Sequence, residues 1–198
     1  GEYRTPSALN FNLDSFEMDV NFISERLQEG LTITVNSENN LDNNLSVIQN
    51  NSLGREAYRL QISEDKIRIE ASHSTGVFYA FESLHQILLI AQNEEKGWPI
   101  ITIEDAPRFE NRGFMSDVAR NFYPKEKLFQ ILDYMALYKL NRFDLKLTDD
   151  DGWRIEIPGL PELTEVGGKR GYTKDENDRL IPMYGSGSGD QKSTGNGF

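Results

Sequence analysis

The spacing of apolar residues in the first hundred positions predicts a small α+β domain. A helical spacing runs from a capping Ser15 to Gly30, and a second helical spacing covers residues 77–91. Between these helices, apolar residues at every second position predict strands with one buried face. The predicted strands are residues 31–35, 58–62 and 67–71, and residues 101–103 suggest one more.

The polar turn of residues 63–66 makes residues 58–71 a predicted β-hairpin. Alternation at Leu9, Phe11 and Leu13 permits a short strand in an otherwise irregular lead. Residues 36–52 are rich in Asn and Ser, and we expect a long surface loop there. The first domain is therefore expected to be a small, mostly antiparallel sheet with two helices on one face.

A domain boundary is expected near residue 106, because Pro107 disfavours helix at the residue before it. We therefore divide the chain into a first domain, residues 1–106, and a second domain, residues 107–198. Beyond residue 168 the chain becomes polar, and the Gly-rich residues 185–197 are typical of a loop. This segment fails as a phosphate-binding loop, because Gln191 precedes the Lys-Ser pair where that motif needs Gly.

The second domain opens with a strand, helix, strand pattern. Residues 113–119 form a mainly apolar run, Pro124 fits a first helical turn, and a helical apolar stripe continues to about Asn141. Alternation over residues 143–147 predicts the second strand, which stops at Thr148-Asp149-Asp150-Asp151-Gly152. The acids thus follow the carboxyl end of a strand, where α/β barrels and open α/β sheets bind their ligands.

Several motifs follow one another over about sixty residues of this second half. They are Arg112-Gly113, Asp117-Val118-Ala119-Arg120-Asn121-Phe122, Met135-Ala136-x-Tyr138-Lys139-Leu140-Asn141, Leu147-Thr148-Asp149-Asp150-x-Gly152-Trp153-Arg154 and Pro161-Glu162-Leu163-Thr164-Glu165. In this order they resemble glycoside hydrolase family 20, the β-N-acetylhexosaminidases, and among them the chitobiase-like branch. In the first half, Tyr58-Arg59-Leu60 and Gly76-Val77-Phe78-Tyr79-Ala80 resemble the non-catalytic domain that precedes the barrel in this family.

The resemblance implies that residues 107–198 are the first β/α units of a truncated (β/α)₈ TIM barrel, since a complete barrel needs roughly 250 residues. It implies a parent enzyme that hydrolyses terminal non-reducing N-acetylhexosamine residues of glycans or chitooligosaccharides. In the family, the substrate's acetamido oxygen attacks the anomeric carbon, and an Asp-Glu pair in a His-x-Gly-Gly-Asp-Glu context assists. That motif is absent from the 198 residues. We therefore expect the chain alone to be inactive and to need the missing remainder of the barrel.

The resemblance also implies roles for individual residues. The Arg of the Arg-Gly motif binds hydroxyls of the terminal sugar in the family, which implies substrate binding by Arg112, although a pair with a nearby acid is the alternative. The first Asp of the Asp-Asp pair orients a His that steadies the catalytic acid, which implies an indirect role for Asp149 and Asp150, with a solvated turn as the alternative. Asp117 belongs either to the same polar network or only to a salt bridge with Arg120.

Two positions depart from the family pattern, which commonly has His where Asp144 and Lys146 stand. These residues lie two positions apart and so face the same side of the strand. Charges that point into a barrel need partners or water. A non-catalytic glycan- or protein-binding module with a decayed barrel is therefore a second hypothesis.

Composition excludes several other classes of function. The net charge of −11 argues against a nucleic-acid partner, and the chain has no cysteine and no apolar run long enough for a membrane span. We predict no cofactor and no metal site, because an EF-hand register ending at Gly152 places Leu147 and Pro158 at ligand positions. Trp153, His73 and His85 are expected to be structural. The resemblance implies a bacterial periplasmic or secreted location.

Overall fold

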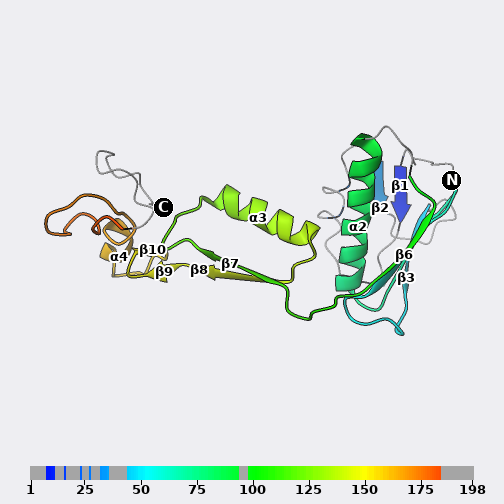
Figure 1. The fold of residues 1–198 in the computed structure, drawn as a ribbon, viewed down its shortest axis with the longest axis horizontal. Coiled ribbons are helices and arrows are strands. Elements are labelled where there is room, and N and C mark those ends of the chain that lie inside the picture. Colours follow the sequence, from blue (N-terminus) through cyan, green and yellow to red (C-terminus); the bar gives the residue numbers. More distant parts are fainter. Residues whose placement is uncertain are drawn as a thin grey trace. The chain divides into compact units, whose positions relative to one another are not determined.

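The computed structural model describes residues 8–11, 16, 23, 27, 32–35, 44–93 and 98–183 (Figure 1). The chain divides into two compact units, residues 1–110 and 111–198. Both units contain helices and strands, so the fold is mixed α+β as predicted. Most of the helix predicted for residues 15–30 and the Gly-rich residues 185–197 lie outside the described residues.

The first unit contains a four-stranded sheet in the order β3-β5-β4-β6, formed by Leu45–Gln49, Ile67–Ala71, Tyr58–Ile62 and Ile101–Asp105. Strands β4 and β5 form the predicted hairpin, with Tyr58 opposite Ala71 and Ile62 opposite Ile67. The Ser63 amide donates to the Lys66 carbonyl at 2.9 Å and closes the turn. The hairpin prediction is therefore confirmed.

Strand β3 corrects one prediction, because it lies within residues 36–52, which were predicted to be a loop. It pairs with β5 in parallel, whereas the β4–β5 and β4–β6 pairs are antiparallel, so the sheet is mostly antiparallel as predicted. Leu45 is fully buried in the core, and Asn50, just after the strand, donates its backbone N–H to the Ala71 carbonyl. Burial and backbone pairing at this edge outweigh the loop preference of an Asn-rich and Ser-rich sequence.

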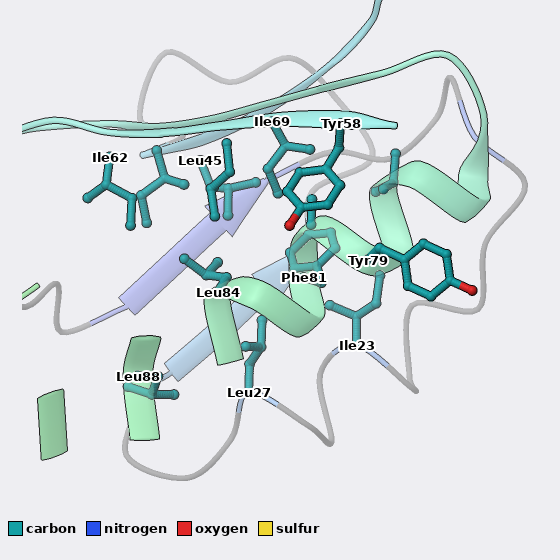
Figure 2. Packing of buried hydrophobic residues seen from close by; sticks show 14 of the residues in the cluster. Ile23, Leu27, Leu45, Tyr58, Ile62, Ile69, Tyr79, Phe81, Leu84 and Leu88 are labelled. Carbon is teal, nitrogen blue, oxygen red and sulfur yellow. The ribbon is translucent and has the colours of Figure 1, made fainter. Parts of the chain in front are cut away.

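Helix α2, Ser74–Asn93, packs against β4 and β5 and supplies one side of the core (Figure 2). Leu84 and Leu88 on the helix are buried together with the sheet residues Leu45, Leu60 and Ile69. These helix positions recur with a helical period, which explains why the sequence predicted this helix and its buried face. The core also contains Ile23 and Leu27, both helical and nearly inaccessible to solvent.

A separate two-stranded parallel sheet joins β1, Ala8–Phe11, to β2, Thr32–Val35. Both strands overlap stretches where the sequence permitted or predicted a strand. Their pairing was not predicted, because the sequence signal of a strand does not identify its partner.

The second unit contains a parallel strand, helix, strand arrangement, as predicted. Strand β7, Gly113–Asp117, pairs with β8, Arg142–Lys146, and helix α3, Lys125–Leu137, connects them (Figure 1). A short antiparallel hairpin follows, made of β9, Thr148–Asp149, and β10, Gly152–Trp153. A single helical turn, α4, Glu162–Glu165, comes next.

Helix α3 ends before the predicted Asn141, in a Schellman motif. The Lys139 amide donates to the Ala136 carbonyl, and the Leu140 amide donates to the Met135 carbonyl at 2.8 Å. Lys139 has φ +57°, a left-handed conformation that usually favours Gly. The helix therefore stops at Leu137, with Tyr138 as its C-cap.

Candidate functional site

Six charged side chains gather where β7 and β8 end and the β9–β10 hairpin begins. We call them the charged cluster: Asp117, Arg120, Lys146, Asp149, Asp150 and Asp151. The parallel register places Asp117 directly opposite Lys146, and the Val118 amide donates to the Lys146 carbonyl at 3.1 Å. Because β7 and β8 run parallel, both strands deliver their last residues to the same edge.

Arg120 is the centre of this cluster. Its Nη1 lies 3.4 Å from Asp117 Oδ2, its Nη2 lies 3.1 Å from Asp149 Oδ2, and its Nε lies 3.2 Å from Asp151 Oδ2. The Arg120 backbone amide also donates to Asp117 Oδ1 at 3.0 Å. The charge of Asp149 raises the pKa of Arg120 above its ordinary value. One guanidinium therefore connects three carboxylates from two strand ends and a turn.

Lys146 is the second cation of the cluster. Its ammonium contacts Asp149 Oδ2 directly and lies 3.3 Å from Asp117 Oδ2. The hydrogen bond with Asp149 raises the pKa of Lys146. Asp144, the other departure from the family pattern, is exposed on β8. The lysine thus has partners of opposite charge, as a charged residue at this position requires.

The acids of the cluster differ in their electrostatics. The hydrogen bond from Lys146 holds the pKa of Asp149 well below its ordinary range. Burial raises the pKa of Asp117, but hydrogen bonds from the Arg120 amide and from Lys146 outweigh burial and lower it. A hydrogen bond with Asp149 and the nearby negative charges raise the pKa of Asp150. Asp117 and Asp149 are therefore fixed acceptors, whereas Asp150 holds its proton to a higher pH.

Arg112 lies at the opposite end of the strand pair from the acids. It precedes β7, whereas Asp149 follows β8, and a parallel pair of five residues spans roughly 16 Å. Arg112 Nε donates to the Lys139 carbonyl at 2.7 Å, and its amide donates to Asn141 Oδ1 at 3.0 Å. These contacts brace the left-handed residue that ends helix α3. The structure therefore does not bring Arg112 close to Asp149 and Asp150, the other residues to which the resemblance gives a role.

Arg120 was assigned no role in substrate binding from the sequence. It was considered only as a salt-bridge partner of Asp117, although a charge three residues after the end of a barrel strand lies where ligands bind. Trp153, in contrast, donates its indole N–H to the Ile155 carbonyl at 2.7 Å, in agreement with a packing role. His73 and His85 lie in the first unit.

A hollow of about 590 Å³ in the first unit is lined by residues from all four strands of the sheet. Its lining includes Gln61, Lys66, Arg68 and Thr102 but no carboxylate and no histidine. General acid or base catalysis needs such a group. The charged cluster is therefore the better candidate for part of an active site.

Among the described residues, no group of three or more His, Asp or Glu side chains could hold a metal ion. No helix in the described part of the chain has the length and apolar character to cross a membrane.

Two family descriptions match the chain. "Glycosyl hydrolase family 20, domain 2" matches residues 3–106, and "Glycosyl hydrolase family 20, catalytic domain" matches residues 109–191. The N,N'-diacetylchitobiase of Vibrio harveyi is 50% identical over 131 residues, which are 66% of this chain and 15% of that protein. A beta-hexosaminidase of Vibrio vulnificus is 36% identical over 84% of this chain and 19% of its own length.

Solved structures of family 20 enzymes are also similar to this chain. A family 20 exo-β-N-acetylglucosaminidase from Vibrio harveyi, in complex with N-acetylglucosamine, has a TM-score of 0.73 and 31% identity over 92% of this chain and 28% of its own. A mutant Streptomyces plicatus beta-hexosaminidase in complex with GlcNAc has a TM-score of 0.72 and 28% identity over 85% of this chain and 36% of its own. The chain thus spans between about a seventh and a third of the length of these relatives.

Proposed function

The chain belongs to glycoside hydrolase family 20, and we propose that the complete protein is a β-N-acetylhexosaminidase. It would release terminal non-reducing N-acetylhexosamine residues from glycans or chitooligosaccharides by substrate-assisted retaining catalysis. The 50% identity to a protein named as a diacetylchitobiase carries this proposal. Two structural neighbours are complexes with N-acetylglucosamine, which supports an N-acetylated amino sugar as substrate.

The second unit is, in this proposal, the start of a (β/α)₈ barrel. Strands β7 and β8 are parallel and joined by a helix, which is the repeating unit of that fold. Apolar side chains of this unit stay exposed, among them Met115 on β7 (56%) and Phe129 on α3 (53%). Exposed apolar surface of this kind supports further strands and helices as its natural cover.

The charged cluster would form part of the rim of the sugar pocket. Asp149, kept ionised by Lys146 and Arg120, is a suitable acceptor for the N–H of an imidazole from a later part of the barrel. Asp117 would hold the side chains of Arg120 and Lys146 in place. Asp150 would share a proton with Asp149. These are indirect roles, in which the side chains orient groups that touch the substrate.

We assign sugar recognition to Arg120 in place of Arg112. A guanidinium has five N–H donors, and the contacts of Arg120 with Asp117, Asp149 and Asp151 use three of them. The Arg120 side chain is 54% exposed, so two donors remain accessible to hydroxyl groups. Its place at the carboxyl end of β7 supports this role, whereas Arg112 lies at the amino end.

The 198 residues by themselves would be inactive, because they lack the Asp-Glu pair that orients the acetamido group and protonates the leaving oxygen. Incubation of the chain and of the full-length protein with 4-nitrophenyl N-acetyl-β-D-glucosaminide tests both statements. We expect release of nitrophenol by the full-length protein alone. Turnover by the 198-residue chain, or none by the full-length protein, would contradict the proposal.

The second hypothesis, a binding module with a decayed barrel, rests on the departures at Asp144 and Lys146. Because Lys146 pairs with Asp117 and Asp149, this departure is compatible with an ordered cluster and does not require decay. Binding of chitooligosaccharides by a full-length protein that hydrolyses none of them would favour the module.

A further inference from the structure

Two buried arginines lie beneath the turn that carries Arg120. The exposed fraction of Arg154 is 9%, and that of Arg170 is 1%. Their guanidinium groups donate to three successive backbone carbonyls, those of Val118, Ala119 and Arg120. The turn after β7 is therefore fixed from inside by two positive charges.

Arg154 is well supplied with acceptors. Its Nε donates to the Val118 carbonyl at 2.9 Å, its Nη2 to the Ala119 carbonyl at 3.1 Å and its Nη1 to the Gly168 carbonyl at 2.5 Å. The ring of Phe122 lies 5.4 Å from its Cζ. Burial, together with the charge of Arg170, lowers the pKa of Arg154 to about 10. The two cations therefore repel each other where little water screens them.

Arg170 lacks such a complement of acceptors. Among the described residues, only its Nη2 has a partner, the Arg120 carbonyl, whereas Nε and Nη1 are shielded from solvent and find no acceptor there. No carboxylate among the residues that the structure describes lies within ion-pair distance of Arg170. Three N–H donors of a buried cation are thus unmatched, and a buried charge is costly unless it is paired and hydrogen-bonded.

Resting on the proposed function, we propose that Arg170 binds a carboxylate side chain from the part of the barrel that lies outside these 198 residues. A water molecule would accept hydrogen bonds but would not offset the two adjacent charges, whereas a carboxylate does both. A carboxylate tethered to the polypeptide has a higher effective concentration at Nε and Nη1 than a free anion has, so we commit to a side chain as the partner. The relatives contain several times more chain than this one, which leaves ample length to supply the acid.

Through this ion pair, folding of the rest of the barrel would stabilise the charged cluster. Arg170 holds the Arg120 carbonyl, and the Arg120 side chain connects Asp117, Asp149 and Asp151. A carboxylate on Arg170 would therefore stabilise the turn that presents Arg120, and the isolated chain would lack this contribution.

The test compares thermal unfolding of the 198-residue chain and of the full-length protein in sodium formate and in sodium chloride of equal ionic strength. Formate is a small carboxylate that can substitute for the missing side chain. The variants are Arg170→Gln, Arg170→Lys and, as a matched control, Arg179→Gln, whose arginine pairs with Asp178 at the surface. Unfolding is measured without any glycosidase assay, so the outcome is independent of the proposed activity.

We expect formate to raise the Tm of the 198-residue chain and of its Arg179→Gln variant by about 2–4 °C relative to chloride. Arg170→Gln should lose the response, and Arg170→Lys should keep part of it. If Arg170→Gln does not fold, the Arg170→Lys and Arg179→Gln variants still provide the comparison. The full-length protein should not respond, because its own carboxylate fills the position.

An equal response of the wild-type and Arg170 variants, or no response of the 198-residue chain, would overturn the proposal. A response of the full-length protein equal to that of the chain would also overturn it, since the position would then be open to free anions. A structure of the full-length protein gives a direct check, with a carboxylate oxygen expected within hydrogen-bond distance of Arg170 Nε or Nη1.

Discussion

Lys146 and Asp117 face each other at the end of the β7–β8 pair, with Lys146 Nζ 3.3 Å from Asp117 Oδ2. The same ammonium contacts Asp149, so one cation joins the last residue of β7 to strand β9, which follows β8. Asp117 and Asp149 both have a lowered pKa in the fold. This relationship makes the stability of the rim depend on pH.

The sign of this dependence follows from the lowered pKa values. Asp117 and Asp149 stabilise the fold above the ordinary Asp pKa of about 3.9, and this contribution is lost as the pH falls through their folded pKa values. The variant Lys146→Met removes one of the cations responsible. Its Tm should therefore lie below that of the wild type at pH 7, and the difference should shrink as the pH falls below about 4. Thermal unfolding of both proteins between pH 3 and pH 7 measures this difference in Tm.

The matched control is Lys127→Met, since Lys127 is an exposed lysine on α3 whose Nζ contacts Gln130. Its Tm should follow the wild-type value at every pH. A difference between Lys146→Met and wild type that stays constant down to pH 3 would show that the ammonium does not act through these carboxylates.

Substitution of the two arginines near β7 distinguishes the rim from the opposite end. In the full-length protein, Arg120→Gln should lower kcat/KM by roughly tenfold to a hundredfold, with most of the loss in KM, because hydrogen bonds to sugar hydroxyls are removed. Arg112→Gln should lower the Tm by loosening the end of α3 and leave KM close to the wild-type value. Steady-state kinetics with a chromogenic N-acetylglucosaminide, together with thermal unfolding, make the comparison. A larger KM effect from Arg112→Gln would return the sugar-binding role to that residue.

Gly152 permits a close approach between the β9–β10 hairpin and the turn that carries Arg120. A Cβ at this position would lie 2.4 Å from the Ala119 carbonyl oxygen and 3.0 Å from Arg154 Nη2. Gly152→Ala should therefore destabilise the second unit by about 1–3 kcal/mol. Gly113→Ala is the control, because its nearest neighbour, Arg142 Cβ, would be at an ordinary 3.4 Å. Equal chemical denaturation curves for the two variants would contradict this prediction.

Leu84 tests the core of the first unit. The side chain is fully buried between α2 and the sheet, so Leu84→Ala should cost about 2–5 kcal/mol of unfolding free energy (Figure 2). Ile90 on the same helix is 59% exposed, and Ile90→Ala should cost much less. Urea unfolding of both variants measures the difference. A similar loss from the two substitutions would mean that α2 does not pack as described.

Elements with a strong local period were predictable from the sequence. The hairpin of β4 and β5 follows strict alternation around a polar turn, and α2 follows a helical stripe over many residues. The parallel β7–α3–β8 arrangement also followed from its pattern. In each case neighbouring residues carry the information, because side-chain direction depends on the backbone period alone.

Strand β3 and the end of α3 were not predictable in this way. The residues of β3 lie in a loop-like composition, and they form a strand because β5 offers backbone partners. Helix α3 ends at a Schellman motif with Lys139 in the conformation that Gly usually adopts, and Arg112 braces it from another part of the chain. Contacts between distant segments outweigh local preference in both places.

The sequence by itself determined the family and the acids that follow β8, because motif residues and their order can be read along one dimension. Only the tertiary structure decided that Arg120, and not Arg112, meets those acids, and that Arg154 and Arg170 lie buried beneath the turn. The physical reason is that electrostatic interaction and burial depend on distances in space. Residues such as Arg120 and Asp149 are 29 positions apart in the chain but 3.1 Å apart at the rim.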